Sequence, residues 1–376
     1  MKHKKEQQDL KMCKEDKLML LCSRTRMNDE IKSQIVSLIQ QEMDWDYLLQ
    51  RSSKHKLTPL LYWQLNKVSH DSVPKDVMEH LKTFFLENAQ KNLLYMGELL
   101  RILELFDSHD ITAIPYKGPI LAIQAYGNLA FRQFDDLDIF IFKKDILKVK
   151  NLLISNGYKI QFQPKGLQEK IYLKSQRDYQ FISPDNSNIE IHWNFIGLSF
   201  SCKHDIFKNP QTPKYIEINN MKISTLSDED MLLILCVHAS GHLWERISWI
   251  CDITEFIRSN KNIDWQILIE KGELYGFQKI LQINILLAVE LLNLKVPNQI
   301  LTDLNIKEST RNISSDIKRN LLKNNEIRKG VLYKAIMRYK IRENKSEKIK
   351  DFFKTTISHF MFPFISIFKG LKFIKT

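Results

Sequence analysis

An acidic segment that leads directly into an apolar strand constrains the fold of this chain more than any other feature. Residues 132–142 have the sequence RQFDDLDIFIF. Successive side chains of a strand point to opposite faces, so Asp136 and Asp138 share one face, and Leu137 and Ile139 share the other. Two carboxylates on one face repel each other unless a cation lies between them. The pattern predicts a platform for a hard divalent cation such as Mg²⁺, which prefers oxygen ligands and substrate phosphates.

A lysine and a glycine precede this strand in a context that favours anion binding. Residues 111–116 are typical of a short buried strand, and an apolar-periodic segment follows Pro119. Gly118 permits a tight turn, and Pro119 suits the first position of a helix, where a missing N–H costs nothing. Free backbone N–H groups at such a turn attract phosphates, and Lys117 adds a positive charge.

A second alternating strand follows at residues 189–195. Its period of two places Glu190, His192 and Asn194 on one face and apolar residues on the other. A third carboxylate, that of Glu190, is therefore offered from a second strand.

Together, the Lys-Gly turn, the arginine four residues before an Asp-x-Asp strand and the later carboxylate in an x-His-Trp strand resemble the DNA polymerase β-like nucleotidyltransferase superfamily. Within it, the chain is most similar to the uncharacterised bacterial nucleotidyltransferase family. The helical segments 45–49, 238–244 and 249–253 are also similar, so the resemblance covers about residues 40–285. Two positions depart from the superfamily pattern: Pro119 replaces a small hydroxyl residue, and Glu190 replaces an aspartate.

The resemblance implies an enzyme that binds an NTP and two Mg²⁺ ions, attaches a nucleoside monophosphate to a hydroxyl of a small molecule, peptide or protein, and releases pyrophosphate. The implied catalytic and metal-binding residues are Asp136, Asp138 and Glu190. The implied nucleotide-binding residues are Lys117, Gly118 and Arg132. Other roles stay open for two of these, since Arg132 can pair with Asp135 or Asp136 and Lys117 can be a solvated loop lysine.

Two histidines one helical turn apart form a second constellation. His238 and His242 have a spacing that can bind zinc, but Ala239 stands where a zinc protease has its general base, and a third ligand is not evident nearby. We therefore expect these two histidines, with His192, on the acceptor side of the cleft. For His192 a structural role beside the metal is the alternative.

Composition favours a cytoplasmic protein. The five cysteines are scattered, and the apolar run 18–22 is too short for a signal-peptide core. The net charge of +12 is concentrated from residue 301 onward, where 18 Lys and Arg face 7 Asp and Glu. The lysine- and arginine-free stretch 355–368 is too short to span a bilayer. This tail can pack on the body, lie on an acidic membrane surface or bind an acidic partner. It carries no known nucleic-acid recognition motif.

The predicted fold class is α+β, with a small mixed β-sheet nucleotidyltransferase core flanked by N- and C-terminal helical regions. Helical periodicity in the N-terminal region is broken at Pro59 and Pro74. The predicted regions are a charged, poorly ordered lead (1–30), an N-terminal helical region (31–107), the core (108–225), a C-terminal helical region (226–300) and a basic helical tail (301–376). The alternative function is a non-catalytic nucleotidyltransferase-like protein that binds through its helical half and tail.

Overall fold

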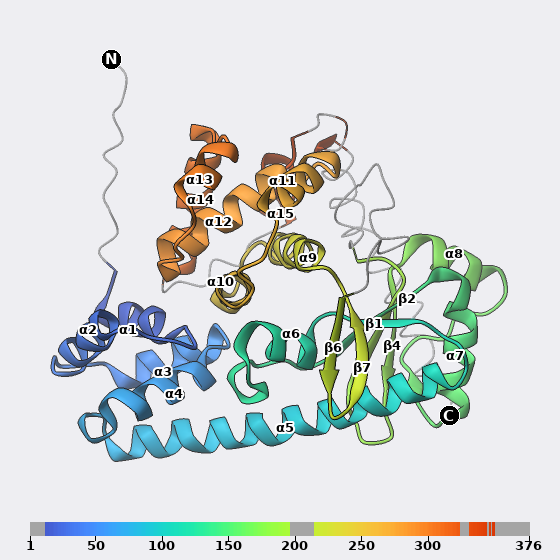
Figure 1. The fold of residues 1–376 in the computed structure, drawn as a ribbon, viewed down its shortest axis with the longest axis horizontal. Helices are drawn as coiled ribbons and strands as arrows, with labels where there is room; N and C mark the ends of the chain where they lie inside the picture. Colours follow the sequence, from blue (N-terminus) through green and yellow to red (C-terminus); the bar gives the residue numbers. More distant parts are fainter. Residues whose placement is uncertain (1–11, 196–213, 324–330, 344–345, 347, 350–376) are drawn as a thin grey trace.

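A small mixed β-sheet lies between helical regions in the computed structural model, which confirms the predicted α+β class (Figure 1). The structure describes residues 12–195, 214–323 and 331–343, together with residues 346, 348 and 349.

Within the described residues, five α-helices precede the sheet. They are α1 (Lys14–Cys22), α2 (Asp29–Ile39), α3 (Trp45–Lys54), α4 (Thr58–Ser69) and α5 (Lys75–Asp107), with a 3-10 turn η1 (His70–Ser72) before α5. Pro59 is the second residue of α4, and Pro74 caps α5, as expected of residues that cannot continue a helix from the preceding turn. Helix α5 runs beneath both the N-terminal helices and the sheet, so it ties the two regions together (Figure 1).

The sheet has the strand order β1-β2-β5-β4-β3. The strands are β1 (Ala113–Pro115), β2 (Leu137–Ile141), β3 (Lys159–Ile160), β4 (Asp178–Ile182) and β5 (Asn188–His192). Strands β2 and β5 are parallel, and the other neighbours are antiparallel. The connecting segments are α6 (Gly118–Leu121), the π-helix η2 (Ala122–Tyr126), η3 (Leu129–Phe131), η4 (Lys143–Asp145), α7 (Ile146–Ser155) and α8 (Leu167–Ser175).

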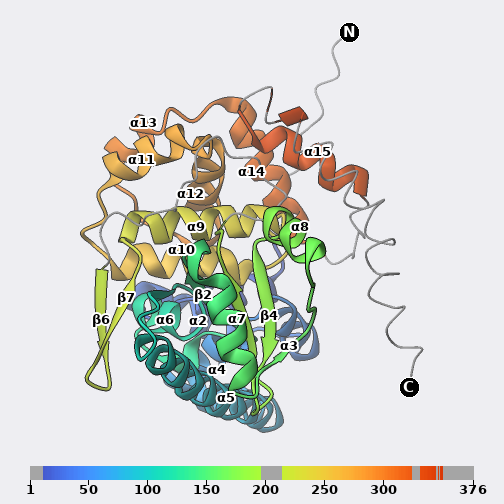
Figure 2. The same cartoon turned by 90° about the vertical axis from the view of Figure 1, so that its right-hand side faces the viewer.

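A hairpin and a helical region follow. The hairpin strands β6 (Lys214–Ile218) and β7 (Met221–Thr225) are joined at Asn219 and Asn220, both with positive φ, as a tight hairpin turn requires. The helices are α9 (Asp228–Gly241), α10 (Ile247–Ser259), α11 (Trp265–Leu274), α12 (Gln278–Leu292), α13 (Asn298–Asp303), α14 (Glu308–Leu321) and α15 (Val331–Ile341). Helices α9 and α10 lie on one side of the core and α5 on the other (Figure 2).

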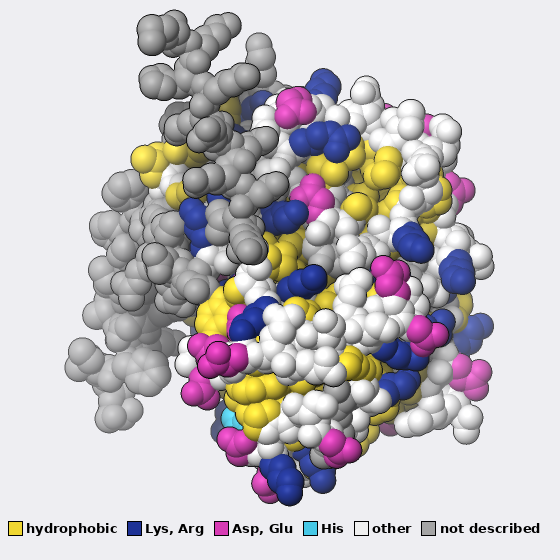
Figure 3. Space-filling view, turned by 90° about the vertical axis from the view of Figure 1, so that its left-hand side faces the viewer, with side chains coloured by type: hydrophobic (Ala, Val, Ile, Leu, Met, Phe, Trp, Pro, Cys, Tyr) yellow, Lys and Arg dark blue, Asp and Glu magenta, His cyan; other side chains and the backbone are white. Residues whose placement is uncertain are grey.

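The surface is of mixed charge where it can be seen. The face in Figure 3 carries acidic and basic side chains interspersed with hydrophobic ones. No helix among the described residues is both long and apolar enough to cross a bilayer.

The structure differs from the sequence predictions in three places. Residues 14–22, predicted within a poorly ordered lead, form α1, whose residues Leu18 to Cys22 are buried because α1 packs against α3 and α4. Helix α8 was not predicted. The predicted boundary between residues 300 and 301 falls inside α13. The aromatic stretch 355–368 of the tail lies outside the described residues.

Candidate active site

Two carboxylates lie side by side on neighbouring parallel strands. Asp138 of β2 pairs in register with Glu190 of β5, which places both side chains on the same face of the sheet. Asp138 is 3% exposed. The carboxylate of the second strand, that of Glu190, therefore lies beside Asp138 of the Asp-x-Asp strand.

Asp138 is surrounded by cationic and hydrogen-bonding groups. Its Oδ1 lies 2.5 Å from Lys117 Nζ, 3.1 Å from His192 Nε2 and 3.4 Å from the Tyr116 hydroxyl. His192 Nε2 also lies 3.2 Å from Glu190 Oε2. Burial opposes ionisation, but Lys117 and His192 hold the pKa of Asp138 well below its usual range. Asp138 is thus a carboxylate whose charge is stabilised before any ligand binds.

Burial and ionic contacts shift the pKa values of Glu190 and His192 in opposite directions. Burial alone would raise the pKa of Glu190 and lower that of His192. Hydrogen bonding to Asp138 first, and then to Glu190, raises the pKa of His192, and the hydrogen bond and charge of His192 lower the pKa of Glu190.

Asp136 lies just before β2, at the entrance to this cluster. Burial and the nearby charge of Asp138 raise the pKa of Asp136 to about 6. A carboxylate with a raised pKa beside two others marks a place where negative charge exceeds the available positive charge. A bound cation would relieve that repulsion.

The Lys-Gly turn packs directly on the acidic loop. Gly118 has φ +52°, and a Cβ at this position would lie 3.1 Å from the Asp136 carbonyl oxygen. Pro119 occupies the start of α6, as predicted. The glycine thus allows the turn that carries Lys117 to approach the backbone of Asp136.

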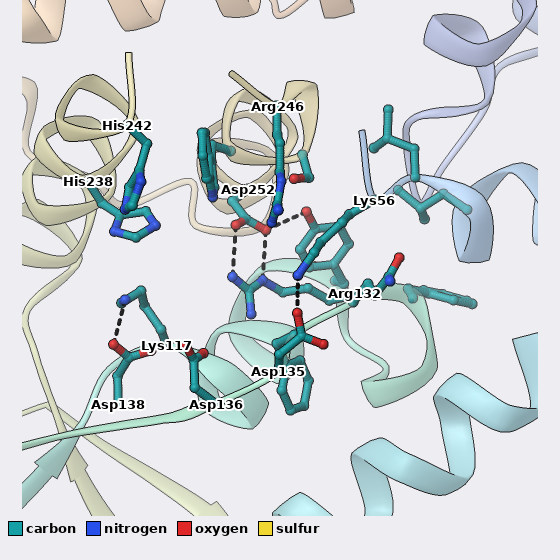
Figure 4. Close-up of a pocket in the computed structure, with 18 residues that line it drawn as sticks. Lys56, Lys117, Arg132, Asp135, Asp136, Asp138, His238, His242, Arg246 and Asp252 are labelled. Carbon is teal, nitrogen blue, oxygen red and sulfur yellow. Dashed lines mark hydrogen bonds and ion pairs between the residues drawn. The ribbon is translucent and has the colours of Figure 1, made fainter. Parts of the chain in front are cut away.

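Lys117, Asp136 and Asp138 line a cavity of about 200 Å³ between the core and the helices, whereas Glu190 and His192 are not among its lining residues (Figure 4). Its basic residues are Lys56, Lys117, Arg132 and Arg246, and its acidic residues are Asp135, Asp136, Asp138 and Asp252. The cavity therefore combines carboxylates on the sheet side with cations from three parts of the chain. Such a combination can hold a metal–polyphosphate complex.

Arg132 is engaged by a partner that the sequence analysis did not identify. Its Nε and Nη2 atoms donate to Asp252 at 2.8 and 2.9 Å, and its Nη1 lies 3.5 Å from the Gly118 carbonyl oxygen. Neither Asp135 nor Asp136, the two structural partners considered from sequence, takes this place. Arg132 remains at the cavity wall, held by α10 (Figure 4).

His238 and His242 line the cavity opposite Lys117 (Figure 4). Their ring centroids are 4.8 Å apart, and His242 lies 4.9 Å from the Trp249 ring. Burial and nearby cations, Lys117 first among them, lower the pKa of His242 to about 4 and that of His238 well below its usual value. Both rings are thus neutral at pH 7 and form an uncharged wall.

Lys56, Arg246 and Asp252 had no role in the sequence analysis. Lys56 forms an ion pair with Asp135, which also lies 2.6 Å from Lys91 of α5. Asp252 could have been noticed, because it is a carboxylate among the buried apolar residues of α10. Lys56 and Arg246 carry no local signal, since each reaches the cavity only through tertiary packing.

The donor set is suited to a divalent cation. One oxygen or nitrogen from each of Asp138, Glu190 and His192 lies within 4.8 Å of the others, the only such group found in the described part of the chain. Asp136 is outside this group, although it shares the electrostatics of the cluster. The buried Nδ1 atom of His192 has no hydrogen-bond partner among the residues that the structure describes.

Comparison with known proteins gives one result. The model of a family described as uncharacterised nucleotidyltransferase matches residues 41–293, which include the core, α3 to α5 and α9 to α12. This match confirms the resemblance inferred from sequence. Neither a curated protein nor a solved structure matches the chain.

Proposed function

The chain belongs to the family of uncharacterised nucleotidyltransferases, and from this premise we propose that it transfers a nucleoside monophosphate from an NTP to an acceptor hydroxyl with the help of Mg²⁺. The acceptor in this proposal is a small molecule, a peptide or a protein.

One observation carries the proposal. Asp138 and Glu190 are paired in register, and Asp138 faces a cavity whose walls carry Lys56, Lys117 and Arg246. Carboxylates alone would bind a cation, and cations alone would bind an anion. Their presence together in one cavity suits a metal–triphosphate complex, which presents both charges.

In this proposal Asp136, Asp138 and Glu190 would hold the metal ions. Bound Mg²⁺ would supply charge neutralisation for the triphosphate and for the attacking and leaving oxygens. Lys56 and Arg246 would bind the outer phosphates, with Lys117 released from Asp138 to join them. Arg132, fixed by Asp252, would direct its remaining Nη1 atom toward the turn at Gly118.

The proposed reaction forms one bond and breaks another. The acceptor hydroxyl oxygen would attack the α-phosphorus, and the bond from that phosphorus to the bridging oxygen of pyrophosphate would break. In this proposal Glu190 would accept the hydroxyl proton. The neutral rings of His238 and His242 would form the acceptor wall.

The test measures Mg²⁺-dependent release of pyrophosphate from each NTP with candidate acceptors of the three classes. We expect Asp138→Asn and Asp136→Asn each to reduce the rate at least about a hundredfold, because the charge that holds the metal is removed. Asp185→Asn is the matched control, since Asp185 is an exposed carboxylate in the turn between β4 and β5.

Equal rates in wild type and Asp138→Asn would contradict the enzymatic proposal. That result would favour the alternative from the sequence analysis, a non-catalytic protein that binds nucleotide or a partner.

A further inference from the structure

A second, larger cavity lies behind the wall of the candidate active site. It measures about 730 Å³, and it is bordered by Tyr126 and Phe131, which also line the first cavity. Its remaining walls come from the loop after α1, from α4, from η2, and from the end of α10 and the residues that follow it. This volume lies within the range of about 300–1,000 Å³ that is usual for small-molecule sites.

The charged side chains at this cavity are all of one sign. Four basic residues line it, Arg26, Lys67, Arg258 and Lys261, and none of its lining residues is acidic. Arg258 is neutralised by Glu255 at 2.5 Å. Arg26, Lys67 and Lys261 are exposed and form no ion pair with any residue that the structure describes.

The first cavity differs in this respect, because its two lysines are paired, Lys56 with Asp135 and Lys117 with Asp138. Three unpaired cations around one hollow repel each other, and the hollow concentrates their positive potential. An anion placed among them would be attracted by all three.

An unpartnered amide lies in the same wall. Gln124 of η2 borders the cavity, and both polar atoms of its side-chain amide are buried without a hydrogen-bond partner. Buried polar groups in proteins nearly always have a partner, and π-helical segments such as η2 often occur at functional sites. Since no hydrogen bond from a described residue holds this amide in place, a rotation of the side chain can turn it toward a bound ligand.

We propose that the second cavity binds an anionic small molecule through a carboxylate or phosphate group held by Arg26, Lys67 and Lys261. The Gln124 amide donates a hydrogen bond to the same ligand. The indole of Trp63, also in the wall, offers a flat apolar surface beside this group. This site is separate from the proposed nucleotide cavity and does not depend on nucleotidyl transfer.

The experiment measures binding of two probes, pyrophosphate and citrate, by isothermal titration calorimetry without NTP or metal. We expect K67A/K261A to weaken binding of the preferred probe about tenfold, because two cations are removed from the anion's surroundings. Preference for pyrophosphate would indicate a phosphorylated ligand, and preference for citrate would indicate a carboxylate ligand. Both lysines are exposed and unpaired, so the variant is expected to fold normally.

Two further variants decide the outcome. K159A/K170A makes the same change in net charge at exposed positions of the core and is expected to bind like wild type.

Q124L removes the amide without breaking a hydrogen bond and is expected to weaken binding several-fold at unchanged stability. The proposal is overturned if neither probe binds, or if K67A/K261A binds both probes as K159A/K170A does. Because no nucleotide is present, absence of transferase activity does not affect this result.

Discussion

Arg132 and Asp252 form a two-point ion pair that joins the loop before β2 to helix α10. The Nε–Oδ1 and Nη2–Oδ2 distances are 2.8 and 2.9 Å, and the Tyr126 hydroxyl donates to Oδ1 at 2.7 Å. The two side chains are only 12% and 5% exposed. This pair fixes the C-terminal helices against the loop that carries Asp136 and leads into β2.

We expect Arg132→Met to lower the free energy of unfolding by about 3 kcal/mol or more, since it leaves the Asp252 carboxylate buried without its cation. Urea denaturation measures the change. The double variant R132M/D252L is expected to recover much of the loss, because no unpaired charge remains. A single variant as stable as wild type would contradict a structural role for the pair.

Alanine substitutions at Gly118 and at Gly127 distinguish the effect of backbone strain from the effect of a steric clash. Both have positive φ, but only at Gly118 would an added Cβ meet the backbone, 3.1 Å from the Asp136 carbonyl oxygen. Alanine at either position is expected to cost about 1 kcal/mol in strain. Gly118→Ala should also displace the Asp136 loop and reduce pyrophosphate release at least about tenfold. If Gly127→Ala reduces the rate equally, the close approach at Gly118 is not important.

Lys117 supplies the positive charge beside Asp138 in the structure. Lys117→Met is expected to destabilise the protein in the absence of metal, because buried Asp138 loses its closest cation. Mg²⁺ should then raise the melting temperature of this variant more than that of wild type, since the ion replaces the lost charge. Differential scanning calorimetry with EDTA and with Mg²⁺ measures both effects.

Lys56→Met is the control for this comparison, because Lys56 pairs with Asp135 rather than with the cluster. Equal Mg²⁺ responses in the Lys117 and Lys56 variants would argue against metal binding at Asp138.

The sequence predicted those parts of the fold that local pattern determines. Alternation identified β2 and β5, and Pro119 after the Lys-Gly turn identified the start of α6. Helix α8 was missed because its apolar residues do not share one buried face: Leu167 and Ile171 are exposed, and Tyr172 and Leu173 are only partly buried. In α1, the charged residues on both sides concealed a buried apolar run.

The site could be predicted only as far as its residues lie on single strands and turns. Asp136, Asp138 and Glu190 were proposed from their own segments, but the register that pairs Asp138 with Glu190 depends on the order of strands in the sheet. The partner of Arg132 lies 120 residues away in sequence. Lys56 is likewise distant from the core, so no local pattern links it to Asp135.

His55, a buried histidine that does not itself line the cavity, provides a test of stability against pH. This imidazole is 1% exposed, and its Nδ1 accepts a hydrogen bond from the Ile247 N–H at 3.3 Å. Burial, with help from Arg51, lowers the pKa of His55 from 6.5 to about 3. Below pH 6.5 the unfolded chain therefore binds a proton that the folded protein excludes. This contribution to stability is complete above pH 6.5 and is lost as the pH falls toward 3.

At pH 5 the loss attributable to His55 is about 2 kcal/mol relative to pH 7.5. His55→Asn keeps an acceptor near the position of Nδ1 but cannot be protonated. Urea denaturation at the two pH values should therefore show a smaller loss in this variant than in wild type, by about that amount. The other buried histidines, such as His238, are present in both proteins, so their contributions to the pH dependence of stability cancel in the comparison. An identical pH dependence in the two proteins would mean that folding does not lower the pKa of His55, and this would contradict the prediction.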